Sequence, residues 1–384
     1  IPAHFPRQQP MSTERVLFAF VIVLALTLNV SGHPGLTTQV LANGVLVALA
    51  SKGYWSDAQT RQPLPLAELA GAPLIGLSSA DPLAAKTSIG VAQWRPTDCV
   101  GQLRLPGCNA DAKVPDMTPK EAAAKGADVI LPPELFCGHY FCKTQEEEHF
   151  ARAMEWPDHP AVRQYAELAA ELGVVLPISF YEAAGNTFFN TLAMIDADGT
   201  TLGIYRKTHI PQGPGYEEKY YFRPGNTGFK VWDVFGTRIG VGVCWDQWYP
   251  ECARAMAMMG AELLFYPSAI GSEPYDADLD TSRMWRRAMI GHSVSNCMPV
   301  VAANRIGSER GGRFLGCSLI AGTNGWPLGK VGGAEDECIL YADVDLSAAR
   351  SAPIWNSLND LPRDRRTDLY DATLGYRLHA PMPR

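Results

Sequence analysis

The sequence predicts an α+β protein in which mixed β-sheets are layered with helices on the outside. Short β-rich segments alternate with helical patterns from residue 87 to residue 180, and strands with little helix between them follow from 191 to 243. The tetrapeptide Asp196-Ala197-Asp198-Gly199 is typical of a hairpin turn between two of these strands. Hairpins combined with helical crossovers favour a layered sandwich over a purely parallel, doubly wound sheet.

Hydrophobic periodicity, together with turn and helix-capping signals, predicts the elements in order along the chain. A strand is expected where β-branched and aromatic residues cluster, and a helix where apolar residues recur every three or four positions. Thr118, Pro119 and Glu121 have the spacing of a capping box, which marks a helix start. The expected strands are Ser88–Gln93, Ala127–Leu131, Val174–Phe180, Thr191–Asp196, Thr201–Arg206, Phe229–Phe235, Arg238–Val243, Glu262–Tyr266, Val300–Asn304, Cys317–Ala321 and Ile339–Asp345, and the expected helices are Thr118–Lys125, Ala161–Leu172, Tyr249–Met259 and Leu279–Asn296.

Composition excludes several classes of function. The chain has 384 residues, of which 47% are hydrophobic, and a formal net charge of −7, which argues against a nucleic-acid or anionic-membrane partner. Its cysteines number 9 and include no C-x-x-C pair, so the spacing of structural zinc sites and dithiol redox motifs is missing. We therefore expect no metal, no cofactor and reduced thiols.

The N-terminal segment differs from the rest of the chain. Residues 1–86 have no stable period and are interpreted as a presequence or linker, before one domain over residues 87–375. The apolar run of residues 16–28 is too short for a membrane span but has the size of a signal-peptide core. Secretory or organellar targeting and an artefact of gene prediction both remain open readings of this segment.

Three reactive side chains follow predicted strands. Glu134 comes after Val129-Ile130-Leu131, Lys207 ends a second strand, and Cys244 lies where a third strand meets a helix. Backbone N–H groups at such a junction are expected to favour the thiolate. Each residue alone is better explained as an ordinary loop acid, edge lysine or buried cysteine. Together they supply the base, the cation and the nucleophile of a cysteine-dependent reaction.

The order Glu134, Lys207, Cys244, in the contexts ELF, YRK and GVCWD, resembles the nitrilase superfamily of carbon–nitrogen hydrolases. The resemblance covers residues 126–371 plus the first strand. It implies a four-layer α-β-β-α sandwich that forms a homo-oligomer through its helical faces, and a cytoplasmic catalytic domain. It also implies a second active-site glutamate, for which Glu218 has the matching place.

The resemblance further implies the chemistry. Cys244 is expected to attack the substrate, Glu134 to act as base, and Lys207 with the backbone N–H of Trp245 to hold the oxyanion. Glu218 is expected to orient the substrate and support Lys207. The family's amphipathic helix after the first strand has no counterpart in residues 95–116, where prolines indicate an inserted loop or a mis-spliced stretch.

The charged residues near Cys244 and at Glu273 suggest which class of substrate the enzyme binds. Related enzymes acting on carbamoyl amino acids place an arginine two or three residues after the cysteine, where this chain has Asp246 and Gln247. Glu273 is expected to bind a terminal ammonium group, and Tyr140 and Trp245 to line a channel for a methylene chain. The motifs look like the branch that hydrolyses N-carbamoylputrescine, so a small N-carbamoyl amine is the expected partner. Another amidase or ureidopropionase-like enzyme of this branch, and a catalytically silent binding subunit, remain alternatives.

Overall fold

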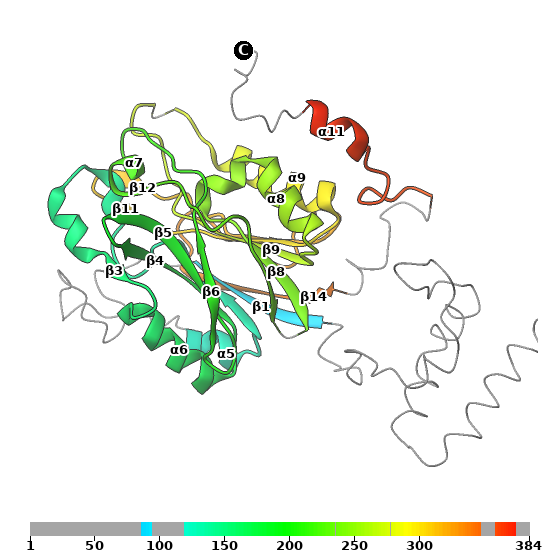
Figure 1. Ribbon diagram of the computed structural model, residues 1–384, viewed down its shortest axis with the longest axis horizontal. Coiled ribbons are helices and arrows are strands. Elements are labelled where there is room, and N and C mark those ends of the chain that lie inside the picture. Colours follow the sequence, from blue (N-terminus) through cyan, green and yellow to red (C-terminus); the bar gives the residue numbers. More distant parts are fainter. Residues whose placement is uncertain (1–85, 94–118, 235, 277, 347–357, 374–384) are drawn as a thin grey trace, which may run out of the picture. The chain divides into compact units, whose positions relative to one another are not determined.

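The computed structural model describes residues 86–93, 119–234, 236–276, 278–346 and 358–373. The predicted presequence, apart from Lys86, and the predicted insertion at 95–116 lie outside the described residues. Figure 1 labels the elements used below. The strands are β1 (Lys86–Gln93), β2 (Val129–Leu131), β3 (Met154–Glu155), β4 (Leu176–Ala184), β5 (Thr187–Ile195), β6 (Thr201–Arg206), β7 (Val231–Val234), β8 (Thr237–Val241), β9 (Leu263–Pro267), β10 (Val300–Ala303), β11 (Ser308–Glu309), β12 (Gly312–Arg313), β13 (Leu319–Ala321) and β14 (Cys338–Asp345).

The helices divide into α-helices and shorter 3-10 turns. The α-helices are α5 (Pro119–Ala124), α6 (Pro160–Leu172), α7 (Glu218–Tyr221), α8 (Pro250–Met258), α9 (Ser282–Asn296) and α11 (Thr367–Thr373), and the 3-10 turns are η2 (Phe141–Lys143), η3 (Glu147–Arg152) and η4 (Cys244–Trp248).

Two groups of strands build the first sheet layer. One has the order β14-β1-β2 and the other β3-β4-β5-β6. They are joined at an isolated parallel bridge between Val129 and Val175, where the Ile130 N–H donates to the Val175 carbonyl at 3.0 Å. The turn at Asp196–Gly199 connects the antiparallel strands β5 and β6, as predicted.

The second sheet has the order β13-β10-β9-β8-β7. Its middle strands β8, β9 and β10 run parallel, and its two edge pairs are antiparallel. Parallel neighbours need helical crossovers, which α8 and α9 supply. The sheet is therefore mixed, in agreement with the predicted fold class.

Strand alternation shows that the second sheet is buried on both faces. Leu263 and Phe265 of β9 contribute to the central core between the sheets, whereas Leu264 and Tyr266 pack against α8 and α9. On the first sheet, Val162 of α6 contributes to a separate core layer. Helices thus cover the outer face of each sheet, which gives the four layers α-β-β-α (Figure 1).

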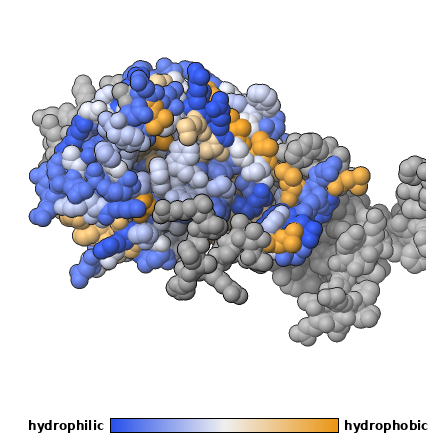
Figure 2. Space-filling view, turned by 90° about the horizontal axis from the view of Figure 1, so that it is seen from above, coloured by the Kyte–Doolittle hydropathy of each residue, from blue (hydrophilic) through white to orange (hydrophobic). Residues whose placement is uncertain are grey.

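The surface of the described part is mainly hydrophilic, with small apolar groups between the polar side chains (Figure 2). Some of the apolar side chains lie on α8 and α9, where Met258 is 41% and Met284 is 53% exposed. Among the described residues, no helix has the length and hydropathy needed to cross a membrane.

Most element boundaries agree with the prediction within a few residues, and two differences have a physical cause. The last long helix begins at Ser282 rather than at Leu279, because the Asp280 carboxylate accepts a hydrogen bond from the Ser282 N–H at 2.9 Å and holds the preceding residues in a turn. The strand expected from Cys317 begins at Leu319. Cys317 has φ +60°, a left-handed conformation that a strand cannot accommodate.

Candidate active site

Three strand ends meet in the interior of the sandwich. Glu134 follows β2, Lys207 follows β6, and Cys244 follows β8, so residues from both sheets converge. Glu134, Lys207 and Glu218 are completely buried, and Cys244 is 5% exposed. The structure therefore brings together the four side chains predicted for catalysis.

Lys207 is at the centre of this cluster. Its Nζ donates to Glu134 Oε1 at 2.8 Å and to the two carboxylate oxygens of Glu218 at 2.9 and 2.7 Å. The Lys207 backbone is fixed as well, because its N–H donates to the Asn190 carbonyl and its carbonyl accepts from the Gly225 N–H, both at 2.8 Å. A Cβ at Gly225 would lie 2.0 Å from the Arg206 carbonyl oxygen, so this close approach requires glycine.

The Glu134 carboxylate is held by one oxygen only. Its Oε1 accepts from Asn190 Nδ2 at 2.6 Å as well as from Lys207, whereas its buried Oε2 has no hydrogen-bond partner among the described residues. The adjacent Leu135 has φ +46°, and the buried Arg305 guanidinium donates to the carbonyl oxygens of Glu134 and Leu135. Arg305 thus stabilises a strained turn that directs one oxygen of Glu134 into the interior.

Cys244 also lies on a strained turn, with φ +43°. The buried Asp246 carboxylate holds this turn by accepting from the Val243 N–H at 2.9 Å, the Tyr205 hydroxyl at 2.8 Å and the His209 N–H at 2.9 Å. The position corresponds to a nucleophile turn between a strand and a helix, although the first helical segment is the 3-10 turn η4 rather than an α-helix.

The expectation of a stabilised thiolate at Cys244 was wrong for the free protein. Burial, followed by the nearby Glu134 carboxylate, raises the pKa of Cys244 well above its ordinary value, despite the opposing effect of Lys207. A backbone hydrogen bond from Ala269 lowers the pKa of Cys244, but burial of the thiol outweighs it. Cys244 therefore rests as a neutral thiol and needs a base.

Burial and charge pairing set the ionisation of the other members. For Lys207, burial lowers the pKa, but the carboxylates of Glu134 and Glu218 outweigh it and leave the pKa well above the ordinary value. Burial raises the pKa of Glu218 to about 7, although Lys207 opposes that shift. One amine therefore shares two carboxylates, and Glu218 is partly protonated at neutral pH.

The three residues predicted for substrate binding have different environments. Tyr140 is 1% exposed, and its hydroxyl donates to Glu218 Oε1 at 2.5 Å, so one end of this ring contacts the buried cluster. Trp245, next to Cys244, is 37% exposed. Glu273 lies in a partly exposed loop, where burial raises the pKa of its carboxyl group.

Sequence reasoning missed four residues that support the site: Asn190, Arg305, Lys143 and, as a structural anchor, Asp246. Asn190 lies on the same face of β5 as the core residues Leu192 and Met194, a pattern that could have indicated an inward-facing amide. Arg305 follows the apolar strand β10, as Lys207 follows β6. Lys143 carried no signal, because a lysine after an apolar run is ordinarily exposed.

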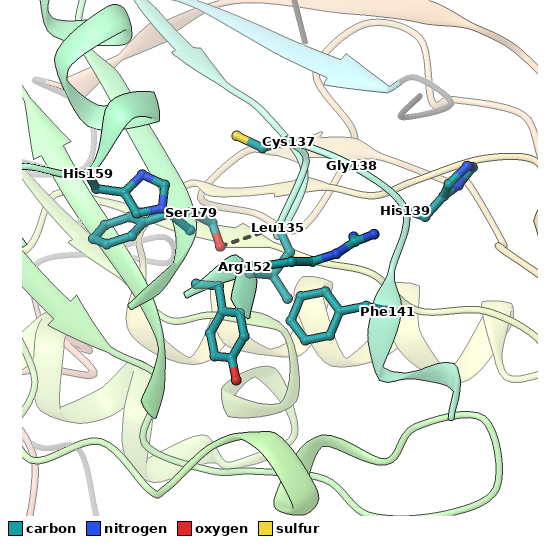
Figure 3. Close-up of a pocket in the computed structure, with 10 residues that line it drawn as sticks. Leu135, Cys137, Gly138, His139, Phe141, Arg152, His159 and Ser179 are labelled. Carbon is teal, nitrogen blue, oxygen red and sulfur yellow. Dashed lines mark hydrogen bonds between the residues drawn. The ribbon is translucent and has the colours of Figure 1, made fainter. Parts of the chain in front are cut away.

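Other candidate features lie outside this cluster. Glu146, Glu148 and His149 are close enough together to hold a metal ion, but Glu146 is already paired with Arg310 at 2.8 Å. A small pocket is lined by Leu135, the neighbour of Glu134 in sequence, and by Arg152, which extends beside Phe141 (Figure 3). None of the four predicted catalytic residues lines this pocket.

An enclosed amine that is shared by two carboxylates next to a thiol suits the cleavage of a carbon–nitrogen bond, and the protein is a hydrolase of linear amides. The chain belongs to the carbon–nitrogen hydrolase family, whose sequence profile matches residues 109–354. This is the nitrilase superfamily to which the sequence motifs pointed.

Individual relatives support the assignment. The chain is 52% identical over 264 residues to the N-carbamoylputrescine amidase of Solanum lycopersicum, covering 66% of this chain and 86% of that protein. It is 46% identical over 255 residues to the citrullinase of Francisella tularensis subsp. tularensis, covering 65% and 88%. The crystal structure of a carbon–nitrogen hydrolase from Helicobacter pylori G27 is similar with a TM-score of 0.64 at 31% identity, covering 75% of this chain and 98% of that one.

Proposed function

We propose that this enzyme hydrolyses N-carbamoylputrescine to putrescine, carbon dioxide and ammonia, with Cys244 as nucleophile. The observation that carries the chemistry is the buried Lys207, which is paired with both Glu134 and Glu218 beside that cysteine. Similarity to an N-carbamoylputrescine amidase over 86% of its length supports the substrate. Glu273 supplies a carboxylate for the distal ammonium group.

The reaction begins with proton transfer. Glu134 uses its free Oε2 to take the proton of Cys244, and the thiolate attacks the carbamoyl carbon. Lys207 Nζ and the Trp245 N–H stabilise the oxyanion of the tetrahedral intermediate. Glu134 then returns the proton to the departing ammonia, which leaves a carbamoyl group on the sulfur.

Hydrolysis of this thioester-like intermediate completes the cycle. Glu134 takes a proton from water, the resulting hydroxide attacks the same carbonyl carbon, and the Cys244 sulfur leaves with that proton. The released carbamate decomposes to putrescine and carbon dioxide. Glu218, held by Lys207 and Tyr140, orients the amide nitrogen of the substrate and keeps the Lys207 amine in place.

Ammonia release tests the proposal directly. The purified chain is incubated with N-carbamoylputrescine, N-carbamoylbutylamine and N-carbamoyl-β-alanine, and Cys244→Ala serves as the inactive control. We expect kcat/KM to be highest for N-carbamoylputrescine. A preference for N-carbamoyl-β-alanine would favour a ureidopropionase-like enzyme, and no ammonia from any of the three would favour a silent binding subunit.

The assembly is a separate proposal. Family resemblance and the exposed methionines of α8 and α9, Met258 and Met284, support association through these helices into a homo-oligomer. Light scattering on the purified chain is expected to give a mass above that of one subunit. A monomer at micromolar concentration would contradict it.

A further inference from the structure

Lys143 is a buried cation without a conventional partner. It ends η2, its side chain is 6% exposed, and its Nζ makes no hydrogen bond to any described residue. Three aromatic rings surround the amine instead, with centroids 4.7 Å away for Tyr216, 4.7 Å for Phe314 and 5.6 Å for Tyr140. A lysine ammonium has three protons to donate, so this environment leaves its hydrogen-bonding capacity unused.

Among the charged side chains near Lys143, Glu273 forms no ion pair with a described residue. Arg305 and Glu309 pair with each other at 3.2 Å, and Glu309 also accepts from the Tyr140 N–H. Glu273 acts electrostatically on Lys143, but within the described part of the chain it forms no ion pair. Burial lowers the pKa of Lys143 to about 8, so the amine is mostly protonated at neutral pH. Among the described residues, Lys143 therefore has no hydrogen-bonded partner, and Glu273, which is hydrogen-bonded to Tyr275, has no cation in direct contact with it.

These charges lie along one aromatic wall that leads to the buried cluster. Tyr140 contacts Lys143 with its ring and Glu218 with its hydroxyl. The Tyr216 hydroxyl accepts from the Gly271 N–H at 2.8 Å, which ties the loop preceding Glu273 to the same wall. Burial raises the pKa of Tyr216, and Glu273 and Cys244 raise it further, so both the loop and the nucleophile are close enough to act on this hydroxyl.

Two glycines allow the Lys143 side chain to pack closely against its neighbours. A Cβ at Gly215 would lie 2.8 Å from Pro274 and 4.0 Å from Cδ of Lys143, so the lysine stem and the Glu273 loop meet at the same glycine. A Cβ at Gly312 would lie 2.6 Å from Lys143 Nζ, so the amine rests against the hairpin of β11 and β12.

We propose that Lys143 and Glu273 form a head-group site for a zwitterionic α-amino-acid end, in which Lys143 binds the carboxylate and Glu273 the ammonium. The substrate class of the enzyme then includes ω-ureido-α-amino acids as well as N-carbamoyl diamines. This inference rests on the proposed hydrolysis of N-carbamoyl amines at Cys244. Citrulline is a suitable probe, because it is N-carbamoylputrescine with one carboxylate added to the carbon that bears the ammonium group.

Three substrates of equal chain length separate the two charges. N-carbamoylputrescine carries the ammonium, 5-ureidopentanoate carries the carboxylate, and citrulline carries both. Ammonia release is measured for the wild type, Lys143→Gln, Lys143→Arg and the control Lys330→Gln, which removes the same charge from a side chain that is 68% exposed.

We expect the wild type to hydrolyse citrulline, and Lys143→Gln to lower its kcat/KM for citrulline about 10- to 100-fold. The same variant should raise kcat/KM for N-carbamoylputrescine several-fold, because a repelling cation is removed. Lys143→Arg should retain most citrulline activity, and Lys330→Gln should leave the ratio of the two substrates unchanged. Because both substrates are measured on each variant, a general loss of folding cancels in the ratio.

Binding of the amine products gives a second measurement. Ornithine and putrescine differ by the same carboxylate, and ornithine should be the stronger competitive inhibitor of the wild type but not of Lys143→Gln. Activity on N-carbamoylputrescine with no hydrolysis of citrulline, or an unchanged substrate ratio in Lys143→Gln, would overturn the head-group site and leave the proposed function intact. Absence of activity on all three substrates would overturn both.

Discussion

The two ends of the proposed substrate site differ in how completely their charges are paired. Around Lys207, the amine is hydrogen-bonded to both carboxylates and every member is buried. The Lys143 amine, by contrast, contacts aromatic rings and makes no hydrogen bond to a described residue, and the nearby Glu273 is partly exposed. The reacting end is thus organised in advance, whereas the distal end leaves its polar capacity for a ligand.

This difference predicts a graded response to substitution. The largest effect is expected for Cys244→Ser, because an alcohol is far harder to ionise than a thiol and Glu134 cannot activate it. Its kcat should fall on the order of 10⁴-fold or more. Steady-state ammonia release measures the loss, and an unchanged circular dichroism spectrum establishes that the fold persists. Near-normal turnover would remove Cys244 from the mechanism.

Lys207→Met should combine two effects. The variant loses an oxyanion donor, which costs about 10²–10³-fold in kcat, and it leaves two buried carboxylates without their shared cation. The second effect should lower the free energy of unfolding by about 3–5 kcal/mol. Urea denaturation of the variant and of exposed Lys330→Met, as control, measures it. Equal stability of the two variants would contradict the view that the reacting end is fully charge-paired.

Glu273→Gln should act at the distal end and more weakly. For N-carbamoylputrescine, kcat/KM should fall about 10- to 100-fold, since a charge-assisted contact to the substrate ammonium becomes a neutral one. For neutral N-carbamoylbutylamine the loss should be small, so the ratio of the two losses isolates the charge. Equal losses for both substrates would make Glu273 a structural residue.

The pH dependence of the free energy of unfolding should reflect the titration of the Glu218 carboxyl group. Its folded pKa of about 7 exceeds the ordinary value of 4.5, so its protonation favours the folded state. The sign follows: this contribution is complete below about pH 4.5 and is lost as the pH rises through about 7, by roughly 1–3 kcal/mol. Thermal unfolding between pH 5 and pH 8 should therefore show a shallower decline in Glu218→Gln than in the wild type. Parallel curves would place the titration on another group.

The smallest effect is expected from metal removal. The proposed chemistry uses only side chains, and the possible metal ligands around Glu146 and His149 do not include any of the residues assigned to the reaction. Dialysis against EDTA should leave kcat/KM unchanged for N-carbamoylputrescine. Inhibition that zinc reverses would require a different mechanism at the reacting end.

How much of this site was predictable depends on how each residue is placed. Glu134, Lys207 and Cys244 each end a strand with a clear apolar pattern, so local sequence locates them at a sheet edge. Arg305 acts through a hydrogen bond to a carbonyl that is 171 residues away in the sequence, a contact that no local pattern contains. The resting state of Cys244 was mispredicted because burial depends on the assembled sandwich, whereas the backbone N–H groups could be inferred locally.

The fold was predictable for a similar reason. Its strands are periodic, and its hairpin turn has a specific signature at Asp196–Gly199, so the elements and their class followed from the sequence. The length of each element was less certain, because local turns, such as the one that Asp280 forms with the Ser282 N–H, shift the residue at which a helix starts. Lys143 shows the limit, since only the surrounding rings of the folded chain explain why a lysine is enclosed there.

The enclosed, protonated state of Cys244 has a consequence for oxidative stress. Peroxide reacts with the thiolate rather than the thiol, and both the high pKa of Cys244 and its 5% exposure keep the reactive form rare in the resting enzyme. Partly exposed cysteines such as Cys137, Cys297, Cys317 and Cys338 are more accessible to oxidants. In the proposed mechanism, Cys244 becomes reactive only when Glu134 removes its proton for a bound substrate, so the same burial that makes a base necessary also preserves the sulfur between turnovers.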